Sequence, residues 1–512
     1  MISFLKKNLF VFFLRLGIKK NRYKNFKDLN FKQNDFINYK VVKNYVLKER
    51  FVHNTSIQDI HTFNFLFFYQ KIGGKKGIDL SKKNIFLWFE KFRFAKNFPW
   101  VGDLSSKRLI SILYNYDFVC SISSKNEIKL INIILNLHIK RIEFDTKIKK
   151  ITDFSSYDIL ALFLIQSIKK NINNVILEKL LEFLNTHIDE NSMHRSYNIL
   201  EHAKFLNNLN EVKNILLFFN VKIPEYLNNQ ILGMTSLLKS YTHTDFTLPL
   251  FNGCNNNHNK EIEKIYSKEQ YLKSKSLLNY KNGLAFYSDV SRAVFFDVVQ
   301  PTSFGFHKSL SAGSLAIEIS SNGEKIITNC GGSEIGGRNP SYLKYSAAHS
   351  TIIINNTNIS EVKEDDIKTK FPKQVMFESK EDKNQIIFKG SHNGYLKNFK
   401  KICKRELVVY KKKNLFIGKD TLISSKSTNN KSVFHIRFHI MPEISTNITS
   451  NKKNIILKTK QNNIWIFKSS NEINIEKSIY VKNDIAIETS QIVISGITSL
   501  LKNNIQWSLE KI

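Results

Sequence analysis

The eight residues from Val433 to Ile440, VFHIRFHI, indicate most clearly how the C-terminal half of the chain folds. From Phe434 onward apolar and polar residues alternate strictly, and successive side chains of a β-strand point to opposite faces. One face would be apolar, formed by Phe434, Ile436, Phe438 and Ile440. The other would be a row of cationic or titratable groups about 7 Å apart, formed by His435, Arg437 and His439. That row is either a binding surface for an anionic chain or an ordinary solvated face.

The same period of two recurs on both sides of this strand, in short runs separated by clusters of Gly, Asn, Asp and Lys. The runs are Ser314–Ile319, Thr351–Ile354, Ile386–Lys389, Leu407–Tyr410, Ile455–Lys458 and Ile464–Lys468. Short, regular strands over about 230 residues are typical of a large antiparallel β-sandwich rather than of βαβ units.

The apolar residues of the N-terminal half follow a helical period instead. One helix face is predicted from residues three or four apart, namely Leu200, Ala203, Leu206, Leu209, Val212 and Leu216. Ile128–Leu137 and Ile159–Leu184 have a similar pattern, and short polar connectors separate such stretches. This layout predicts successive antiparallel helices.

A chain of 512 residues has room for two to four domains of about 150 residues. Its 42% hydrophobic and 24% charged residues are those of an ordinary globular protein, which excludes a disordered or polytopic membrane chain. The expected fold class is multidomain α and β. We expect a basic N-terminal segment (residues 1–45), a helical domain (46–265) and the β-sandwich (266–512).

The formal net charge of +33 favours polyanionic partners such as nucleic acid, acidic polysaccharide or anionic lipid. A second interpretation is compositional, because the chain is rich in Lys, Asn, Ile and Phe together, as an AT-rich genome would produce. The basic residues are spread over the whole chain and no nucleic-acid-binding motif is present. We therefore expect no specific nucleic-acid partner.

The four cysteines and the N-terminus exclude several classes. Cys120, Cys254, Cys330 and Cys403 lie far apart, so neither a zinc ribbon nor a disulfide framework is predicted. The apolar run Asn8–Leu14 is too short to span a bilayer and lacks a small-residue cleavage site after it. It is either a basic interfacial helix touching a membrane or simply the first helix of the fold.

Motifs of nucleotide binding and zinc-protease chemistry are absent, since the sequence has no P-loop, no G-x-G-x-x-G after a strand and no H-E-x-x-H. The serine-hydrolase motif G-x-S-x-G is absent too. The glycine-rich stretch 329–338 follows a strand but precedes no helical pattern, so we interpret it as a turn and loop.

Three ordered motifs carry a family resemblance: SAGSLAIEIS (residues 311–320), NCGG (329–332) and YSAAHSTIIINNTNISEV (345–362). Together they resemble the C-terminal domain of the heparinase II/III-like superfamily, most closely its little-characterised bacterial branch. The turn Phe251-Asn252-Gly253, the Arg437-Phe438-His439 segment and, more weakly, Trp100, Ser105 and Arg108 extend the resemblance.

The resemblance implies an N-terminal incomplete (α/α) toroid followed by a large antiparallel β-sandwich, with the active site in the cleft between them. It implies β-elimination on uronic-acid polysaccharides of the heparan, heparin or alginate type. Such a site must neutralise the uronate carboxylate, remove the C5 proton and protonate the leaving oxygen. A location in the cell envelope or periplasm would follow; the cytoplasm is the alternative, because we see no cleavable signal.

In the sandwich, the resemblance assigns His349 to the family histidine that is a zinc ligand in metal-binding relatives, and Lys344 to a position that usually carries Arg. Ser309 and Ser311 occupy the places of a His-x-His pair, and Asn329 occupies the place of a ligating Asp. One ligand out of several does not make a zinc site, so we expect no metal and no cofactor. His307 could substitute for the lost catalytic histidine.

In the helical half, Asp189–Ser196 resembles a family loop, with Arg195 in place and His194 two residues beyond the family histidine. His194 and Arg195 beside Asp189 could form a carboxylate-binding and proton-transfer corner, or merely cap a helix. His243 could be oriented and made more basic by Asp245, or both could belong to a surface turn. The further substrate-binding candidates are Lys344, Arg338 and Arg437.

The sequence thus predicts a polysaccharide-lyase-like protein with His349, His243, His194 and His307 as catalytic candidates. Its alternative is a catalytically degenerate glycan-binding or envelope-polymer scaffold of the same fold. Non-specific binding of nucleic acid through the +33 charge is a third possibility.

Overall fold

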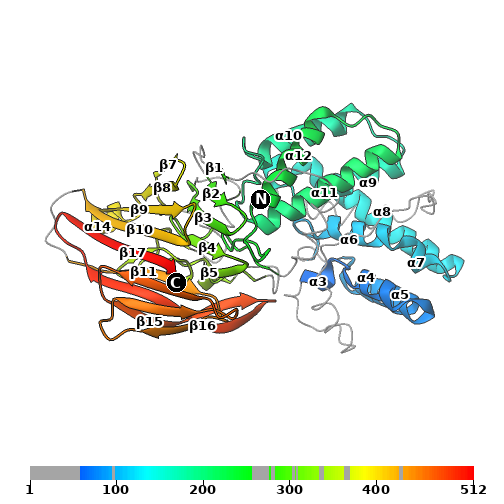
Figure 1. Ribbon diagram of the computed structural model, residues 1–512. Helices are drawn as coiled ribbons and strands as arrows, with labels where there is room; N and C mark the ends of the chain where they lie inside the picture. Colours follow the sequence, from blue (N-terminus) through cyan, green and yellow to red (C-terminus); the bar gives the residue numbers. More distant parts are fainter. Residues whose placement is uncertain are drawn as a thin grey trace. The chain divides into compact units, whose positions relative to one another are not determined.

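The computed structural model describes residues 58–94, 99–256, 276–277, 283–301, 306, 310–333, 340–362, 370–425 and 431–512 (Figure 1). They form two compact units. Of the described residues, the helical unit holds 58–187 and 204–231, whereas the sandwich unit holds 188–203 and everything from 232 onward. The predicted order, helices first and a large antiparallel β-sandwich second, is confirmed. The proposed domain limits at 45 and 265 fall outside the described residues.

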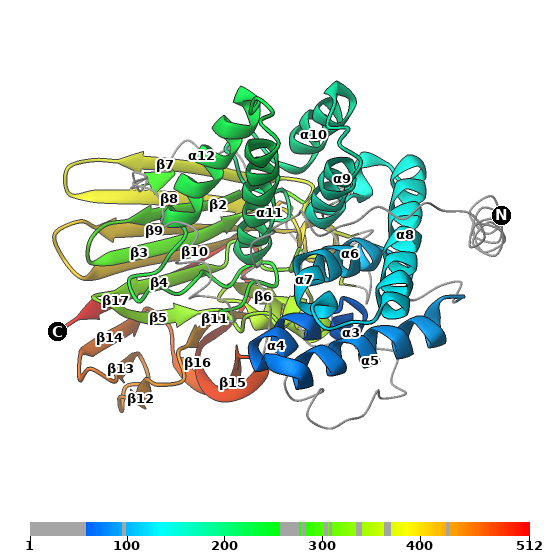
Figure 2. The ribbon, with the colours of Figure 1, turned by 90° about the vertical axis from the view of Figure 1, so that its right-hand side faces the viewer.

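The described N-terminal half is entirely helical (Figure 2). Its helices are α3 Gln58–His61, α4 Phe65–Ile72, α5 Gly74–Phe92, α6 Leu104–Tyr114, α7 Tyr116–Cys120, α8 Lys125–Ile148, α9 Ser156–Ile168, α10 Asn174–His187, α11 Ile199–Phe218 and α12 Glu225–Ser240. Two of them begin with a capping box, in which Ser124 pairs with Glu127 and Ser155 with Asp158. These reciprocal bonds satisfy backbone N–H groups that a helix start would otherwise leave unpaired. None of the described helices has both the length and the apolar character needed to cross a membrane.

Arg108 is a fully buried cation that fixes the centre of the helical unit. Its guanidinium lies 4.3 Å from the ring centroid of Trp88 and 4.8 Å from that of Trp100. It donates to Nε2 of His138 and to the carbonyls of His61 and Pro99. The Trp100 and Arg108 positions of the family resemblance are therefore structural, since they join four helices, α3, α5, α6 and α8, and a loop.

The sandwich unit contains two antiparallel sheets. The first sheet contains β1 Ser276–Leu277, β2 Gly283–Ser288, β3 Arg292–Val298, β4 Ile317–Ser321, β5 Glu324–Thr328, β6 Ile352–Ile354, β11 Val433–Ile440, β15 Ile473–Lys482 and β16 Ile485–Ile497. The second sheet contains β7 Val375–Glu381, β8 Gln385–His392, β9 Lys401–Tyr410, β10 Leu415–Ser424, β12 Ser445–Ile448, β13 Asn454–Lys458, β14 Ile464–Ser469 and β17 Lys502–Lys511.

Strand β11 has the two faces that its alternation predicts. Phe434, Ile436, Phe438 and Ile440 are buried in the core between the sheets. The ring centroid of Phe438 lies 4.8 Å from that of Trp507 on β17 of the second sheet. The opposite face carries His435, Arg437 and His439, and β11 runs beside β6 through the pair His435 and Ile353. The four cysteines are buried and form no disulfide.

Candidate functional site

The segment Ser346–Thr351, which carries His349, is tied to its neighbours by buried hydroxyl groups. Ser346 Oγ donates to the carbonyl of Ala312 at 2.6 Å, and Ser350 Oγ donates to that of Thr328 at 2.6 Å. Thr351 Oγ1 donates to the carbonyl of Ser314 at 2.7 Å. Because a buried hydroxyl and carbonyl left unpaired would each be costly, these bonds fix the backbone on both sides of His349.

The carbonyl of Ser350 is held from the other sheet. Arg405, on β9, forms an ion pair with Asp420 on β10, and both side chains are fully buried. Its Nη1 also donates to the carbonyls of Ser350 and Leu315, at 2.7 and 2.9 Å. The Ser-Thr that follows His349 in the sequence motif is therefore a structural anchor of the histidine.

The imidazole of His349 is 2% exposed, and neither ring nitrogen has a hydrogen-bond partner within the described part of the chain. Burial lowers its pKa to about 4, so the ring is neutral near pH 7. Buried polar groups normally have a partner, in the chain or outside it. His349 is therefore a rigidly held, neutral imidazole with unused hydrogen-bonding capacity.

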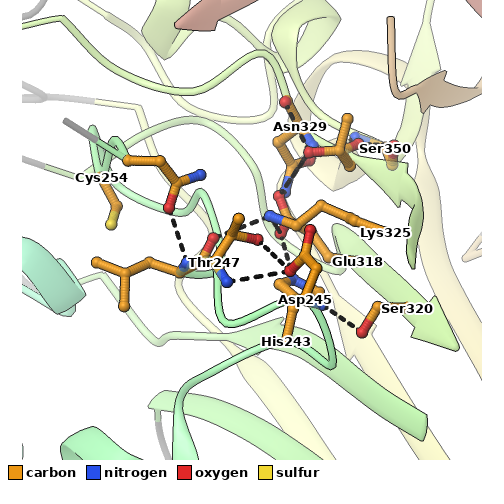
Figure 3. Close-up of polar contacts among 12 residues, drawn as sticks. His243, Asp245, Thr247, Cys254, Glu318, Ser320, Lys325, Asn329 and Ser350 are labelled. Carbon is orange, nitrogen blue, oxygen red and sulfur yellow. Dashed lines mark hydrogen bonds and ion pairs between the residues drawn. The ribbon is translucent and has the colours of Figure 1, made fainter. Parts of the chain in front are cut away.

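A buried carboxylate, Glu318 on β4, organises the sheet beside this segment (Figure 3). Its Oε2 lies 3.1 Å from Nζ of Lys325 and 2.8 Å from Nε2 of His243. Its Oε1 accepts from the backbone N–H and side-chain Nδ2 of Asn329, at 2.9 and 3.0 Å, and from the hydroxyl of Thr328 at 3.3 Å. Burial opposes ionisation, but Lys325 and then His243 outweigh it and lower the pKa of Glu318 to about 2.

His243 is held in one tautomer by a directed chain of hydrogen bonds. The backbone N–H of Thr244 donates to Ser320 Oγ, and that hydroxyl lies 2.8 Å from His243 Nδ1. His243 Nε2 then donates to Glu318. Burial, followed by the positive charge of Lys325, lowers the pKa of His243 to about 4.

The expectation that Asp245 orients His243 is wrong, whereas the negative charge of Asp245 does act to raise the pKa of His243, as expected. Asp245 Oδ1 accepts from the N–H and the hydroxyl of Thr247, so it closes its own turn. Glu318 and Ser320 orient the imidazole instead, and burial makes it less basic.

Asn252 joins three segments of the sandwich unit. Its backbone is left-handed, with φ of 53°. Its Nδ2 donates to the carbonyl of Tyr197, its own carbonyl accepts from Asn198 Nδ2, and its Oδ1 accepts from the N–H of Ser311. The next residue, Gly253, lies so close to Gly332 that a Cβ on Gly332 would be 2.0 Å from the Gly253 carbonyl oxygen. The FNG and NCGG motifs are therefore packed together, backbone on backbone.

The loop that carries His194 and Arg195 leads into α11. Asp189 Oδ1 accepts from the N–H groups of Asn191 and Met193, and Asn198 Oδ1 accepts from those of Leu200 and Glu201 at the helix start. His194 is half-buried, with Nδ1 2.7 Å from Ser196 Oγ, and Arg195 is exposed. The helix-capping interpretation describes Asn198 well, whereas the proton-transfer corner stays a prediction.

The cationic row on β11 is largely occupied by neighbours. Arg437 Nη1 lies 2.9 Å from Glu476, and His435 Nδ1 lies 2.9 Å from Ser495 Oγ. His439 is buried, and its Nδ1 lies 2.7 Å from Ser478 Oγ. Of the other cationic candidates, Lys344 is 9% exposed, on the short helix η4 Ser341–Lys344.

The structure thus brings His349, His243 and Arg437 around one segment. Glu318 and Asn329 link His243 to Ser350, and the N–H of Arg437 donates to the carbonyl of Thr351. His307 and Arg338 lie outside the described residues.

Among the residues that the structure describes, no set of side chains is equivalent to the zinc ligands of metal-binding relatives. Within the described ranges, no three His, Cys, Asp or Glu side chains are grouped as metal ligands. Asn329 is committed to Glu318 and Ser350, and Ser311 offers a neutral hydroxyl where relatives have an imidazole. Zinc sites are built from imidazole, thiolate and carboxylate, so these residues do not fit the metal.

Sequence reasoning missed Glu318 and Lys325 as the centre of this region. A signal was present, since Glu318 is the charged member of an apolar strand, Ala316-Ile-Glu-Ile319, and Lys325 precedes Ile326 and Ile327. A charge inside a buried strand is almost never left unpaired.

Comparison with known proteins gives a family-model match for one region and a fold for the whole chain. Residues 282–508 match the family model described as heparinase II/III-like, C-terminal. A crystal structure of heparinase III matches with a TM-score of 0.75 at 12% identity, over 99% of this chain and 89% of that chain. Heparan sulfate lyase HepC from Pedobacter heparinus matches with a TM-score of 0.60 at 12% identity, over 99% and 88%.

A further heparinase III structure matches with a TM-score of 0.66 at 10% identity, over 98% of this chain and 88% of that chain. No curated protein matches the sequence. The predicted resemblance and fold class are confirmed.

Proposed function

Because residues 282–508 are a heparinase II/III-like C-terminal domain and the chain has the heparinase III fold, we propose that this protein is a polysaccharide lyase that cleaves a uronic-acid-containing acidic polysaccharide by β-elimination. Heparan-, heparin- and alginate-like chains are the proposed substrates. The location of such glycans suggests the cell envelope or periplasm, with the cytoplasm as the alternative.

The observation that carries the proposal is His349. A neutral imidazole with no partner in the described chain can accept a proton at neutral pH, as removal of the C5 proton requires. The hydroxyl groups of Ser346, Ser350 and Thr351 hold the backbone around His349 in one position. A fixed backbone keeps the imidazole in the geometry that proton transfer needs.

The remaining roles are assigned by charge. Arg195 is exposed on the loop beside His194, and together they are proposed to bind the uronate carboxylate and assist proton transfer. Neutralising that carboxylate makes the C5 proton easier to remove. Lys344 and, in the part of the chain not described, Arg338 and His307 are proposed as further contributors. Arg437 is a weaker candidate, since Glu476 already occupies its Nη1.

The test is incubation of the purified chain with alginate, heparan sulfate, heparin and related uronans. β-Elimination leaves an unsaturated uronate, so ultraviolet absorbance of the product should rise with time. A neutral glucan is the matched control, because it has no carboxylate to make its C5 proton acidic. Absence of any unsaturated product from all these uronans would overturn the proposal.

A second function, glycan binding without cleavage, is favoured by a specific observation. Asn329 and Ser311 replace ligating residues of metal-binding relatives, and His243 has both ring nitrogens bonded inside the fold. This alternative predicts saturable binding of uronans with no product.

A binding assay with DNA of equal charge density distinguishes both proposed functions from non-specific attraction between a positively charged protein and any polyanion. Binding through bulk charge would be equal for DNA and uronans and would fall steeply with salt.

A further inference from the structure

We infer that Glu318, acting through Asn329, holds the His349 segment in place without a metal ion, and that Asn329 is a positioning residue for His349. The inference concerns how the histidine is held, so it stands or falls independently of what the protein cleaves or binds.

Asn329 is a bridge between two elements. Its Nδ2 donates to Glu318 Oε1 at 3.0 Å, and its Oδ1 accepts from the backbone N–H of Ser350 at 2.8 Å. Ser350 directly follows His349, and the three residues of the bridge are all fully buried. The Asn329 side chain therefore fixes the position of Ser350, the residue next to His349, relative to the Glu318 carboxylate on β4 (Figure 3).

The bridge needs an amide and not a carboxylate. An amide supplies one donor and one acceptor at once, and both are used here. An Asp at this position could still accept from Ser350, but it would face Glu318 oxygen to oxygen with no hydrogen between them. Two carboxylates at such a distance cannot both be ionised.

The carboxylate at the other end is already saturated. Glu318 has about four lone-pair sites, and its donors are Thr328, the backbone and side chain of Asn329, His243 and Lys325. Lys325, with 0% side-chain exposure, neutralises its charge directly. Glu318 has no lone-pair site left for a bound cation, and no further cation is needed to balance its charge.

The bridge extends past Ser350. The hydroxyl of Ser350 donates to the carbonyl of Thr328 and accepts from the backbone N–H of His439 on β11. One continuous set of hydrogen bonds therefore joins β4, the end of β5, the His349 segment and β11. A metal ion bound by residues from these same segments would hold the segments together in the same way. The hydrogen-bond network can therefore take the place of a metal ion.

The first experiment measures the metal directly. The purified full-length chain is dialysed and analysed by elemental mass spectrometry, and its thermal unfolding is followed with and without a chelator. We expect zinc far below one atom per chain and an unfolding midpoint that the chelator leaves unchanged. Stoichiometric zinc, or a midpoint that falls with chelator and recovers with added zinc, would overturn the inference.

The second experiment compares Asn329→Ala with Asn329→Asp, both in chelator. Asn329→Ala removes both hydrogen bonds and adds no charge, so its midpoint should fall by about 5 °C at every pH from 5 to 8. Asn329→Asp should fall further at pH 8 than at pH 5. In that variant the introduced carboxyl and Glu318 form a pair in which one member has a raised folded pKa, and the stability of its protonated form is lost as the pH rises.

The third readout is specific to positioning. Diethyl pyrocarbonate modifies accessible imidazoles, and peptide mass spectrometry reports the reaction of each histidine. His349 should be protected in the wild type and react several-fold faster in Asn329→Ala.

The matched control is Asn208→Ala. Asn208 is equally buried and loses one hydrogen bond, to Ser156, but it lies in the helical unit. It should lower the midpoint without changing the reactivity of His349. Equal reactivity of His349 in the wild type and in Asn329→Ala would overturn the positioning role even if stability falls.

Discussion

The imidazole of His349 lies against Gly313, where a methyl group would fit only if the ring shifted by a few tenths of an ångström. A Cβ built on Gly313 would be 3.0 Å from Cγ of His349 and 3.2 Å from its Cδ2 and Nδ1. The backbone of Gly313 is outside the left-handed region, so an alanine could adopt it without strain. The glycine of the SAGSL motif is therefore favoured by its tight contact with the histidine of the AAHST motif and not by backbone conformation.

Gly313→Ala should consequently destabilise the protein by about 1–3 kcal/mol through overpacking. The measurement is urea unfolding of the wild type, Gly313→Ala, His349→Ala and the double variant. Removing the ring should remove the clash, so the two substitutions should be non-additive. Strict additivity would show that the ring moves aside at no cost and that Gly313 has another role.

His349→Gln should lower the rate of uronan cleavage by about 100-fold to 10,000-fold, the usual contribution of a general acid or base. Gln keeps a polar side chain of similar size, so the loss would reflect proton transfer rather than folding. The measurement is the ultraviolet progress curve of the unsaturated product.

His392→Gln is the matched control for that variant. His392 is also buried, has an Nε2 without a partner in the described chain, and has a pKa lowered to about 3, but it lies at the end of β8 on the other sheet. Its rate should stay within about twofold of the wild type. Equal losses in both variants would mean that only stability was measured.

The sequence reveals local features better than long-range ones. The faces of β11 follow from alternation within eight residues, and its apolar members are in the core as predicted. Helices α8, α9 and α11 follow from periodic apolar residues in the same way. Each of these patterns is encoded within one element, so no knowledge of its neighbours is needed.

The candidate site was predictable only in part, because its partners are distant in the sequence. Asp245 is two residues from His243, yet the carboxylate that holds His243 is Glu318, 75 residues away. Asn329 could be recognised as a missing metal ligand, but not as a bridge to Glu318. That contact depends on the pairing of β4 with β5, whose register shifts at Ile319 and Ser320. A register shift leaves no clear mark in the sequence.

The stability of the protein should fall steeply as the pH falls below about 6.5. Burial lowers the folded pKa of six fully buried histidines to about 3 or about 4, namely His138, His202, His243, His349, His392 and His439. In the unfolded chain they titrate at 6.5. The unfolded state therefore binds more protons between these values, and stability present above pH 6.5 is lost on acidification.

Each of these histidines should lower the free energy of unfolding by about 1 kcal/mol at pH 5.5. The sum of the six is comparable to the whole free energy of unfolding of a typical domain. The measurement is the thermal midpoint from pH 8 to pH 4.5, with His392→Leu as a variant that should have a shallower slope below pH 6.5. A midpoint that stays constant or rises between pH 7 and pH 5 would contradict the prediction.

Lys325→Met should be among the most damaging single substitutions in the sandwich. Nζ of Lys325 donates to Glu318 at 3.1 Å and to the carbonyl of Leu248 at 2.9 Å. Methionine would leave Glu318 as a buried charge without its cation, at a cost of about 3–5 kcal/mol. Adding Glu318→Gln should recover part of this loss, because the remaining donors can bond to a neutral amide oxygen.

The pH dependence separates this charge effect from a simple packing defect. Lys325 is the strongest influence that lowers the pKa of Glu318 against its burial, so removing Lys325 raises that pKa. A raised folded pKa gives stability that is lost as the pH rises. Urea unfolding should therefore show a larger loss in the free energy of unfolding for Lys325→Met at pH 8 than at pH 5.5, each relative to wild type at the same pH.

Lys389→Met, which breaks an exposed pair with Glu406, is the control and should change the free energy of unfolding by less than about 1 kcal/mol at both pH values. If the Lys325→Met deficit is the same at both, the lost interaction is packing of the lysine stem and not neutralisation of Glu318.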